Sequence, residues 1–393
     1  MKKIISLVLA FALCCSLCVA VSAEEIGYYE ENSLHFYIGE TKASFTGCDE
    51  GLSGDVIIPA YVNGYPVVEF DDSALKRGSE ITSITLPETM EMLYTNGFMG
   101  AESLENIYVD ENNNEFISVD GVLYGKGSDE LVVFPKGRTG SYTVPAFTKS
   151  IFKTAFSNSK IEEVTFEAQL EEIEEQTFSD CANLKKITLP DSVKYIGAYA
   201  FQNCTSLKNI DLPKALIGLD EGVFSYCTAL ENINISSENE YYKSRDGVLF
   251  DAITDYLVQY PAGNPRDYYA IPAETYVIEK YAFAGCKNLR TIAFHKDINT
   301  VESYAFDCCE GLEKIEYDGN GFQWDEINIE YGNDNLESVK PDGGFVYNVF
   351  SILEIPVIFV EGGLMWIWMA ISAVILLPVA LLQDLINGEL TLF

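Results

Sequence analysis

The sequence predicts a solenoid, a fold in which short repeated units stack and share one continuous apolar core. Phenylalanine recurs in steps of 23 residues at Phe178, Phe201 and Phe224, and again at Phe283 and Phe306. Each of these residues has an apolar residue five positions before it, cysteine three after, leucine six after and isoleucine nine after. A unit this short cannot bury its own apolar residues, so neighbouring units must supply the core by stacking.

Each repeat predicts one short strand followed by a tight turn. The segment Leu184–Leu189 ends in alternating apolar and polar residues, which is typical of a half-buried strand. Pro190 and Pro213 end two such strands, because proline has no amide hydrogen to donate to a sheet. The Ala-Phe-x-x-Cys part is short enough for a single turn. We therefore expect residues 70–318 to form a parallel sheet with short helical or irregular turns.

Two inserts interrupt the 23-residue spacing, near residues 111–145 and 237–272. Both contain an Asp-Gly pair followed by apolar residues, at Asp120–Tyr124 and Asp246–Phe250, and the two copies are offset by 126 residues. This offset predicts an internal duplication, in which each insert is a β-hairpin that protrudes and still contributes one coil. The arms expected for the first hairpin are Val122–Tyr124 and Leu131–Phe134.

The repeat region needs a cover at both ends, because an open solenoid would expose its core. Residues 24–69 lack the repeat and are rich in glycine, valine, isoleucine and aromatic residues, which predicts an N-terminal β-rich cap. Residues 319–344, rich in glycine, aspartate and asparagine, are the expected closing cap and linker.

The N-terminus predicts export. Lys2 and Lys3 precede an apolar run over residues 4–21, and Val-Ser-Ala follows at residues 21–23. These are the parts of a secretory signal peptide, so we expect residues 1–23 to be removed. A lipid anchor on Cys14 or Cys18 is the less favoured alternative, because leucine rather than a small residue precedes each.

The C-terminus predicts a hydrophobic helix and a membrane segment. Residues 345–382 are largely apolar, and residues 362–382 carry no charge. About 20 apolar residues suffice to cross a bilayer, so 362–382 is the expected span. The short tail, 383–393, contains acidic residues but no lysine or arginine. A helix buried against the solenoid is therefore the alternative.

The repeat also resembles a known family. The pattern I-x-x-x-A-F-x-x-C-x-x-L-x-x-I-x-L-P, present from Ile196 to Pro213, is similar to that of the BspA-like bacterial leucine-rich-repeat surface proteins. The resemblance covers about residues 56–317 and implies a leucine-rich-repeat solenoid. It also implies a secreted or surface-displayed protein that mediates adhesion or protein contacts, without a common enzymatic activity.

The cysteines favour a structural interpretation. Seven would remain after removal of residues 1–23, and five of them share one repeat position: Cys181, Cys204, Cys227, Cys286 and Cys309. A fixed place in a repeated core is typical of small buried thiols. Disulfides between stacked coils are the alternative, although parallel Cβ directions would hold the sulfur atoms too far apart.

No motif predicts catalysis, a cofactor or a metal site. The histidines are His35 and His295, and His295 is expected at the surface end of a strand. The acidic run Asp110–Glu115 lacks the spacing of a calcium loop, so a solvated turn is the favoured interpretation. The net charge of −35 disfavours nucleic acid as a partner, because phosphate is bound by lysine and arginine.

A binding face is expected on the concave side of the sheet, where polar residues alternate with buried ones. Repeat proteins use such extended faces for recognition. The alternative is that the polar face only keeps the sheet soluble. The expected ligand is an extracellular protein or glycan, and the alternative is a structural envelope protein without an external ligand. The residues predicted to form this face are Asn106, Tyr108, Lys186, Thr188, Asn209, Asp211, Asn232, Asn234, Lys314 and Glu316.

Overall fold

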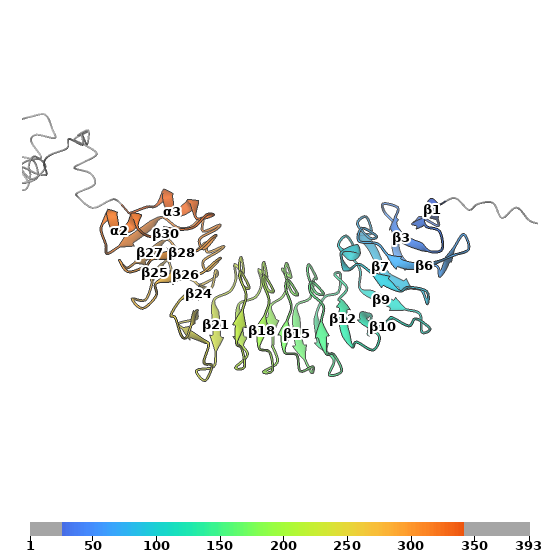
Figure 1. The fold of residues 1–393 in the computed structure, drawn as a ribbon, viewed down its shortest axis with the longest axis horizontal. Coiled ribbons are helices and arrows are strands. Elements are labelled where there is room, and N and C mark those ends of the chain that lie inside the picture. The colour runs from blue at the N-terminus through green and yellow to red at the C-terminus, as the bar shows by residue number, and fades with distance from the viewer. Residues whose placement is uncertain (1–25, 342–393) are drawn as a thin grey trace, which may run out of the picture. The chain divides into compact units, whose positions relative to one another are not determined.

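The computed structural model describes residues 26–341, which lie within one compact unit. Figure 1 shows these residues as a succession of short strands connected by turns. No helix among them is long and apolar enough to span a membrane. The predicted signal peptide 1–23, the hydrophobic segment 345–382 and the tail 383–393 lie outside the described residues and stay predictions.

The N-terminal part contains an antiparallel sheet followed by the first parallel pairs. Strands β1, β2 and β3 pair antiparallel, whereas β3 pairs in parallel with β6, and β4 with β7. Parallel stacking therefore begins inside the segment 24–69 that was predicted as a cap. The elements are β1 (Gly27–Glu31), β2 (Leu34–Ile38), β3 (Ala43–Cys48), β4 (Ser53–Ile57), β5 (Tyr61–Val62), β6 (Tyr65–Phe70), β7 (Glu80–Leu86), β8 (Met92–Leu93), the 3-10 helix η1 (Thr95–Phe98) and β9 (Asn106–Val109).

The middle part holds the first insert and the regular repeats. Strands β19 and β21 pair in parallel with a 23-residue offset, Asn209 opposite Asn232 and Leu212 opposite Ile235. The elements are β10 (Phe116–Val119), β11 (Val122–Gly125), β12 (Glu130–Val133), β13 (Ser141–Val144), β14 (Ser150–Ile151), β15 (Glu163–Phe166), β16 (Glu172–Ile173), β17 (Lys186–Ile187), β18 (Tyr195–Ile196), β19 (Asn209–Leu212), β20 (Gly218–Leu219) and β21 (Asn232–Ile235).

The C-terminal part repeats this plan and ends in two short helices. Trp324 and Leu336 are buried against the last coils, and β30 pairs in parallel with β28, so residues 321–338 continue the stack. The elements are β22 (Tyr242–Arg245), β23 (Val248–Asp251), β24 (Leu257–Gln259), β25 (Tyr268–Ala270), β26 (Val277–Ile278), β27 (Thr291–Phe294), β28 (Thr300–Val301), β29 (Lys314–Tyr317), α2 (Gly321–Asp325), β30 (Asn328–Ile329) and α3 (Asp334–Ser338).

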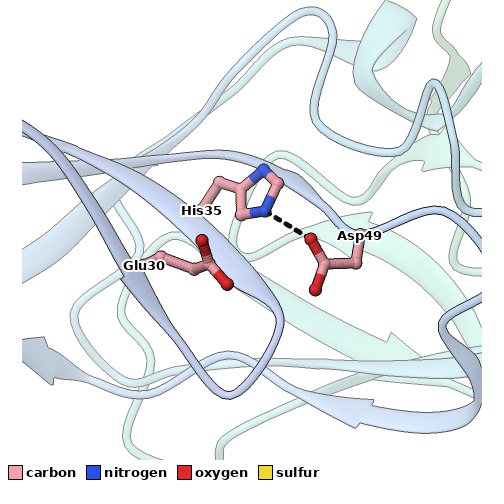
Figure 2. Close-up of side chains that lie close together, drawn as sticks. All are labelled: Glu30, His35 and Asp49. Carbon is pink, nitrogen blue, oxygen red and sulfur yellow. Dashed lines mark hydrogen bonds and ion pairs between the residues drawn. The ribbon is translucent and has the colours of Figure 1, made fainter.

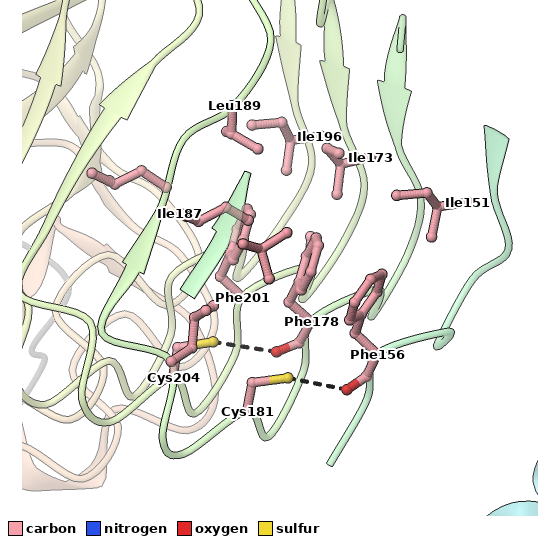
Figure 3. Close-up of a cluster of buried hydrophobic side chains, with 14 of the residues drawn as sticks. Ile151, Phe156, Ile173, Phe178, Cys181, Ile187, Leu189, Ile196, Phe201 and Cys204 are labelled. Carbon is pink, nitrogen blue, oxygen red and sulfur yellow. Dashed lines mark hydrogen bonds between the residues drawn. The ribbon is translucent and has the colours of Figure 1, made fainter. Parts of the chain in front are cut away.

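The repeated phenylalanines form a column of stacked rings inside the coils (Figure 3). The ring centroids of Phe156 and Phe178 are 4.8 Å apart, and those of Phe178 and Phe201 are 5.3 Å apart. Each ring is fully buried, and a buried phenylalanine contributes about 1.5–3 kcal/mol relative to an exposed one. This column confirms the predicted repeat and explains why the aromatic position is kept at each step.

The turns around Phe156, Phe178 and Phe201 are irregular and not helical, whereas Phe98 ends the 3-10 helix η1. Gln176 and Asp180, two residues on either side of Phe178, have φ angles of 55° and 60°, a left-handed conformation that cannot continue a helix. The cysteine thiol closes the turn against the preceding coil: Cys181 Sγ donates to the carbonyl oxygen of Phe156 at 3.1 Å (Figure 3). The solenoid consequently contains little helix.

One coil has leucine where the repeat has phenylalanine: Leu75 lies 23 residues before Phe98. Leu75 keeps the backbone register, because its amide donates to the Gly97 carbonyl as the Phe178 amide does to Ala200. The ring that stacks on Phe98 is instead Phe70, at a centroid distance of 4.5 Å. The sequence pattern therefore placed the backbone correctly, while a neighbouring residue supplies the ring.

Both inserts form the predicted hairpin, with one more strand than expected. Strands β11 and β12 pair antiparallel as predicted, but β10 also pairs with β11 around Asp120 and Gly121. These two residues have φ angles of 51° and 73°, as the central residues of a type I′ turn require. The second insert repeats this arrangement with β22, β23 and β24.

Each insert also contributes one coil, as predicted. Strand β12 pairs in parallel with β14, and the Phe134 ring stacks on Phe156 at 4.6 Å. In the second insert, the Tyr260 ring stacks on Phe283 at 5.0 Å. The inserts are therefore continuous with the stack.

The inserts divide the core into three clusters. On β11, Leu123 packs into the N-terminal cluster, whereas Val122 and Tyr124 pack into the middle one. On β23, Leu249 packs into the middle cluster and Phe250 into the C-terminal one. Because side chains alternate across a strand, one strand of each insert joins two neighbouring cores.

Candidate functional site

The structure distributes the ten residues of the predicted binding face over four separate sheets, because β19 and β21 form a two-stranded sheet apart from that of β13, β15 and β17. Asn106 and Tyr108 lie on β9, in the sheet formed by β4, β7 and β9, and Lys314 and Glu316 lie on β29 beside β27. The remaining six lie on or directly after three strands of the middle part. We call strands β13, β15, β17, β19 and β21 the central ladder; its predicted residues are Lys186, Thr188, Asn209, Asp211, Asn232 and Asn234.

On the central ladder, polar side chains bond to their equivalents one coil away. Asn232 donates to Asn209 Oδ1 at 2.9 Å, and Asn234 donates to Asp211 Oδ1 at 2.9 Å. Lys186 Nζ lies 2.8 Å from Glu163 Oε1. These side chains are thereby held in fixed rows, which lowers the conformational entropy that a ligand would have to remove.

Two of the predicted residues lie beneath the inserts and not on an open face. A Cβ atom on Gly121 would come within 2.3 Å of Asn106 Oδ1, and one on Gly247 within 2.6 Å of Asn232 Oδ1. The insert backbone also accepts the strand amides, from Ile107 to Gly121 and from Ile233 to Gly247. Each Asp-Gly turn therefore covers the edge of a parallel sheet, and Asn106 and Asn232 pack against that turn.

A second surface was missed from the sequence: a groove of about 870 Å³ on the antiparallel N-terminal sheet. Its side chains come from the exposed faces of β1, β2, β3 and β6, where they alternate with buried residues such as Phe36 and Phe45. The alternating stretch around Asn32-Ser33 was the signal that could have revealed this hairpin. The lining residues are Tyr28, Tyr29, Glu30, His35, Tyr37, Gly39, Lys42, Ser44, Thr46, Glu69, Asp71 and Ser73.

Glu30 and His35 of this groove converge with Asp49 (Figure 2). His35 Nε2 lies 2.9 Å from Asp49 Oδ1, and one ligand atom from each of the three residues lies within 4.8 Å of the others. Hydrogen bonds from Ser33 and His35 hold the pKa of the Asp49 carboxyl below its usual range. Asp49 is therefore ionised at neutral pH.

His295 directly follows β27, as expected, and is partly exposed. Both of its ring nitrogens are nevertheless shielded from solvent and have no hydrogen-bond partner among the described residues.

A small cleft of about 120 Å³ lies beside the second insert. Its lining includes Glu279, whose pKa is raised to about 7 by burial and by the charges of Glu302 and Asp251. A carboxyl with this pKa could exchange a proton near neutral pH. The other acidic residues that line the cleft are Asp220, Glu221 and Glu302, and its one lysine, Lys280, is paired with Glu221.

The cysteines are buried thiols at their repeat positions. Cys181, Cys204, Cys227, Cys286 and Cys309 are free and buried, and burial raises the pKa of Cys181 to about 11. Such thiols are poor nucleophiles and poor metal ligands, because both roles need the thiolate. Cys308 is the exposed thiol among the seven described cysteines.

Parallel coils of this length, each with a left-handed turn and two short strands where the sequence predicted one, define a leucine-rich-repeat β-solenoid. The model of the BspA type leucine rich repeat region matches in six copies, over residues 44–119, 138–245 and 266–344. The chain belongs to this family. The match begins within the segment predicted as a cap and ends beyond the last predicted repeat, so the repeat region is longer than the sequence pattern indicated.

Solved structures of similar proteins come from several bacteria. A leucine rich cell surface protein from Faecalibacterium prausnitzii is 20% identical, with 78% of this chain and 99% of that chain covered and a TM-score of 0.42. A leucine-rich repeat protein from Bacteroides ovatus is 20% identical, with 79% and 77% covered and a TM-score of 0.44. The pneumococcal vaccine antigen PcpA is 21% identical, with 74% and 70% covered and a TM-score of 0.42. A comparison with curated proteins found no match.

Proposed function

We propose that this protein is an exported, non-catalytic binding protein that recognises an extracellular protein or glycan through the exposed face of the central ladder. The observation that carries this proposal is the set of hydrogen-bonded rows on β19 and β21, where exposed Asp211 and Asn234 are fixed before any ligand arrives. Preorganised polar side chains on successive stacked strands favour recognition of an extended partner.

Export and membrane attachment belong to the same proposal. The signal peptide predicted at residues 1–23 supplies export, and the uncharged stretch 362–382 supplies an anchor of bilayer length. The similar protein from Faecalibacterium prausnitzii is described as a cell surface protein, which agrees with this location. Adhesion is the activity that a displayed binding protein would perform.

A structural envelope protein is the second candidate. Its supporting observation is the same set of rows, because Asn209, Asn232 and Asn234 already satisfy one another or Asp211 and need no ligand. In that case the face serves only to keep the sheet hydrated, and the partners are other envelope components.

The test is equilibrium binding of the purified protein to an array of extracellular-matrix proteins and glycans. We expect saturable binding that is lost when Lys186, Asn209, Asp211, Asn232 and Asn234 are all replaced by alanine. A control variant replaces Glu171 and Lys194, an exposed ion pair on the other side of the coil, and should bind as the parent does.

The outcomes separate the two candidates. Loss of binding in the ladder variant alone, with both variants folded by circular dichroism, supports recognition through the central ladder. Equal binding by all three proteins moves the binding site elsewhere. Absence of binding to every target favours the envelope protein.

A further inference from the structure

We propose that Glu30, His35 and Asp49 form a binding site for a divalent transition-metal ion of the zinc type at the N-terminal groove. This site is independent of the central ladder, which lies on other strands. One imidazole nitrogen and two carboxylate oxygens converge here, all within 4.8 Å of one another (Figure 2). Zinc binds histidine nitrogen and carboxylate oxygen at about 2.0–2.2 Å, so ligand atoms around it are separated by about 3.3 Å. Small side-chain rotations close the difference.

Strand pairing and one backbone hydrogen bond fix the Cα positions of these three residues relative to one another. Glu30 and His35 are directly opposite each other on β1 and β2, on either side of a turn at Asn32 and Ser33. Both turn residues have positive φ angles, 53° and 64°, which is the two-residue turn that suits a hairpin. The amide of Asp49 donates to the Ser33 carbonyl at 3.0 Å, so the end of β3 is tied to the same turn.

The charges at the site favour a cation. Two carboxylates approach one histidine, and like charges at this separation repel unless a positive charge lies between them. A chain with a net charge of −35 further concentrates cations near its surface.

The donor set distinguishes between metal ions. Calcium and magnesium prefer oxygen ligands alone, whereas an imidazole nitrogen beside carboxylates suits zinc and its neighbours in the first transition row. Three protein ligands leave at least one coordination position for water or for a group from a bound molecule. Because Glu30 and His35 also line the groove, that position is accessible from it.

The competing explanation is that His35 and Asp49 form only an ordinary surface hydrogen bond. In that case Glu30 has no role, and replacing it should have no effect on metal binding. Glu30 is exposed, so Glu30→Gln leaves the fold intact and separates the two explanations even if a change at His35 disturbs the hairpin.

The experiment is isothermal titration of the purified full-length protein with zinc chloride, in parallel with calcium and magnesium chloride. The parent for all variants carries Cys308→Ser, because this exposed thiol could bind zinc by itself. Any zinc held by other thiols is the same in every variant, so the differences between variants report on the site. We expect one zinc ion to depend on the three residues, with affinity at least about tenfold weaker in Glu30→Gln, His35→Ala and Asp49→Asn.

The matched control is His295→Ala, which removes the other histidine of the chain and should leave zinc affinity unchanged. Circular dichroism verifies that each variant is folded. Zinc binding that is unchanged in both Glu30→Gln and His35→Ala overturns the proposal, as does absence of saturable zinc binding by the parent.

Discussion

The two insert junctions share one backbone plan but are held together by different side chains. In each, the insert lies between the turn of the coil before it and the turn of the coil after it. We call this separation the gap, and side chains from the two turns contact each other across it. At the first junction lysines make these contacts: Lys136 Nζ donates to the Met99 carbonyl at 3.2 Å, and Lys160 Nζ to the Glu102 carbonyl at 2.9 Å.

At the second junction tyrosines make contacts of a kind absent from the first, beside one lysine contact, the Lys280–Glu221 ion pair at 2.8 Å. Tyr226 donates through its hydroxyl to Asp307 Oδ2 at 2.5 Å, and the rings of Tyr199 and Tyr281 pack edge to face at a centroid distance of 5.7 Å. Gly222 leaves the space for that pair, because a Cβ atom there would lie within 2.6 Å of the Tyr199 ring. The duplication has thus preserved strand pairing, whereas the side chains across the gap have diverged.

Features shared by the two junctions are those that the backbone or the core requires. The Asp-Gly turn and the stacked ring are present at both junctions, since each is required by backbone conformation or by core packing. The contacts across the gap require only that polar groups be paired, and several residue types satisfy that requirement.

Truncating the stacked ring of either insert should have the largest effect. Phe134→Ala and Tyr260→Ala each remove a buried aromatic ring, and we expect each to lower the free energy of unfolding by about 3–5 kcal/mol. Urea denaturation followed by circular dichroism measures this loss. A much smaller loss at one junction would show that its coil is not part of the continuous stack.

The same two positions offer a matched pair of conservative changes. The Tyr260 hydroxyl is buried without a partner, so Tyr260→Phe should leave stability unchanged or raise it. Phe134→Tyr would bury a new hydroxyl and should cost about 1–3 kcal/mol. Equal changes in the free energy of unfolding for Tyr260→Phe and Phe134→Tyr would contradict this difference between the two ring sites.

Glu279 makes the second junction dependent on pH. Its folded pKa of about 7 exceeds the value near 4.3 expected for an unfolded glutamate, so the folded chain favours the protonated carboxyl. The stability contributed by this protonation is complete below pH 4.3 and is lost as pH rises through 7. Asp220, Asp251, Glu302 and the Lys280–Glu221 ion pair are the charged groups around it.

Glu279→Gln tests this dependence because glutamine stays neutral. The stability of the variant relative to the parent should increase by about 3 kcal/mol between pH 4 and pH 8. Thermal unfolding at a series of pH values measures the difference. A constant difference across this range would mean that Glu279 titrates normally.

Single contacts across the two gaps should have smaller effects. Tyr226→Phe removes the hydrogen bond to Asp307 at the second junction, and Lys136→Met removes the bond to Met99 at the first. Each should lower the free energy of unfolding by about 1 kcal/mol. The double variant should show the sum, since the two junctions share no contact residue; strong coupling between them would argue against three separable cores.

Thiol labelling needs no substitution and should have the smallest effect on stability. It reports whether individual coils open in the native protein. Cys308 is exposed, whereas Cys181 is buried with a raised pKa, so iodoacetamide should label Cys308 in the native protein and Cys181 only after unfolding. Peptide mapping by mass spectrometry distinguishes the two sites. Rapid native labelling of Cys181 would show that its coil opens readily.

Much of this fold could be predicted because the repeat imposes a period on the sequence. The step between Phe178 and Phe201 fixed the coil length, and that period placed β19 and β21 in register. The third strand of each insert was not predicted, although Asp120-Gly121 signals a two-residue turn, because β10 before that turn lacks a clear alternation of apolar and polar residues.

The candidate site was less predictable, for physical reasons. Alternation predicted which side chains of β19 face outward, but not that the Gly247 turn would cover Asn232. The cluster of Glu30, His35 and Asp49 depends on pairing among three strands, and no sequence period links its members. Such a cluster becomes visible only in the three-dimensional structure.

The most direct test of a binding role for the central ladder uses cells that display the full-length chain. These cells would be incubated with the ligand identified on the array, alongside cells that display the five-residue ladder variant, and bound ligand would be measured by flow cytometry. We predict saturable binding to the parent cells and loss of that binding in the variant at equal surface display, verified by protease accessibility. Equal binding to both kinds of cell would contradict recognition through this face.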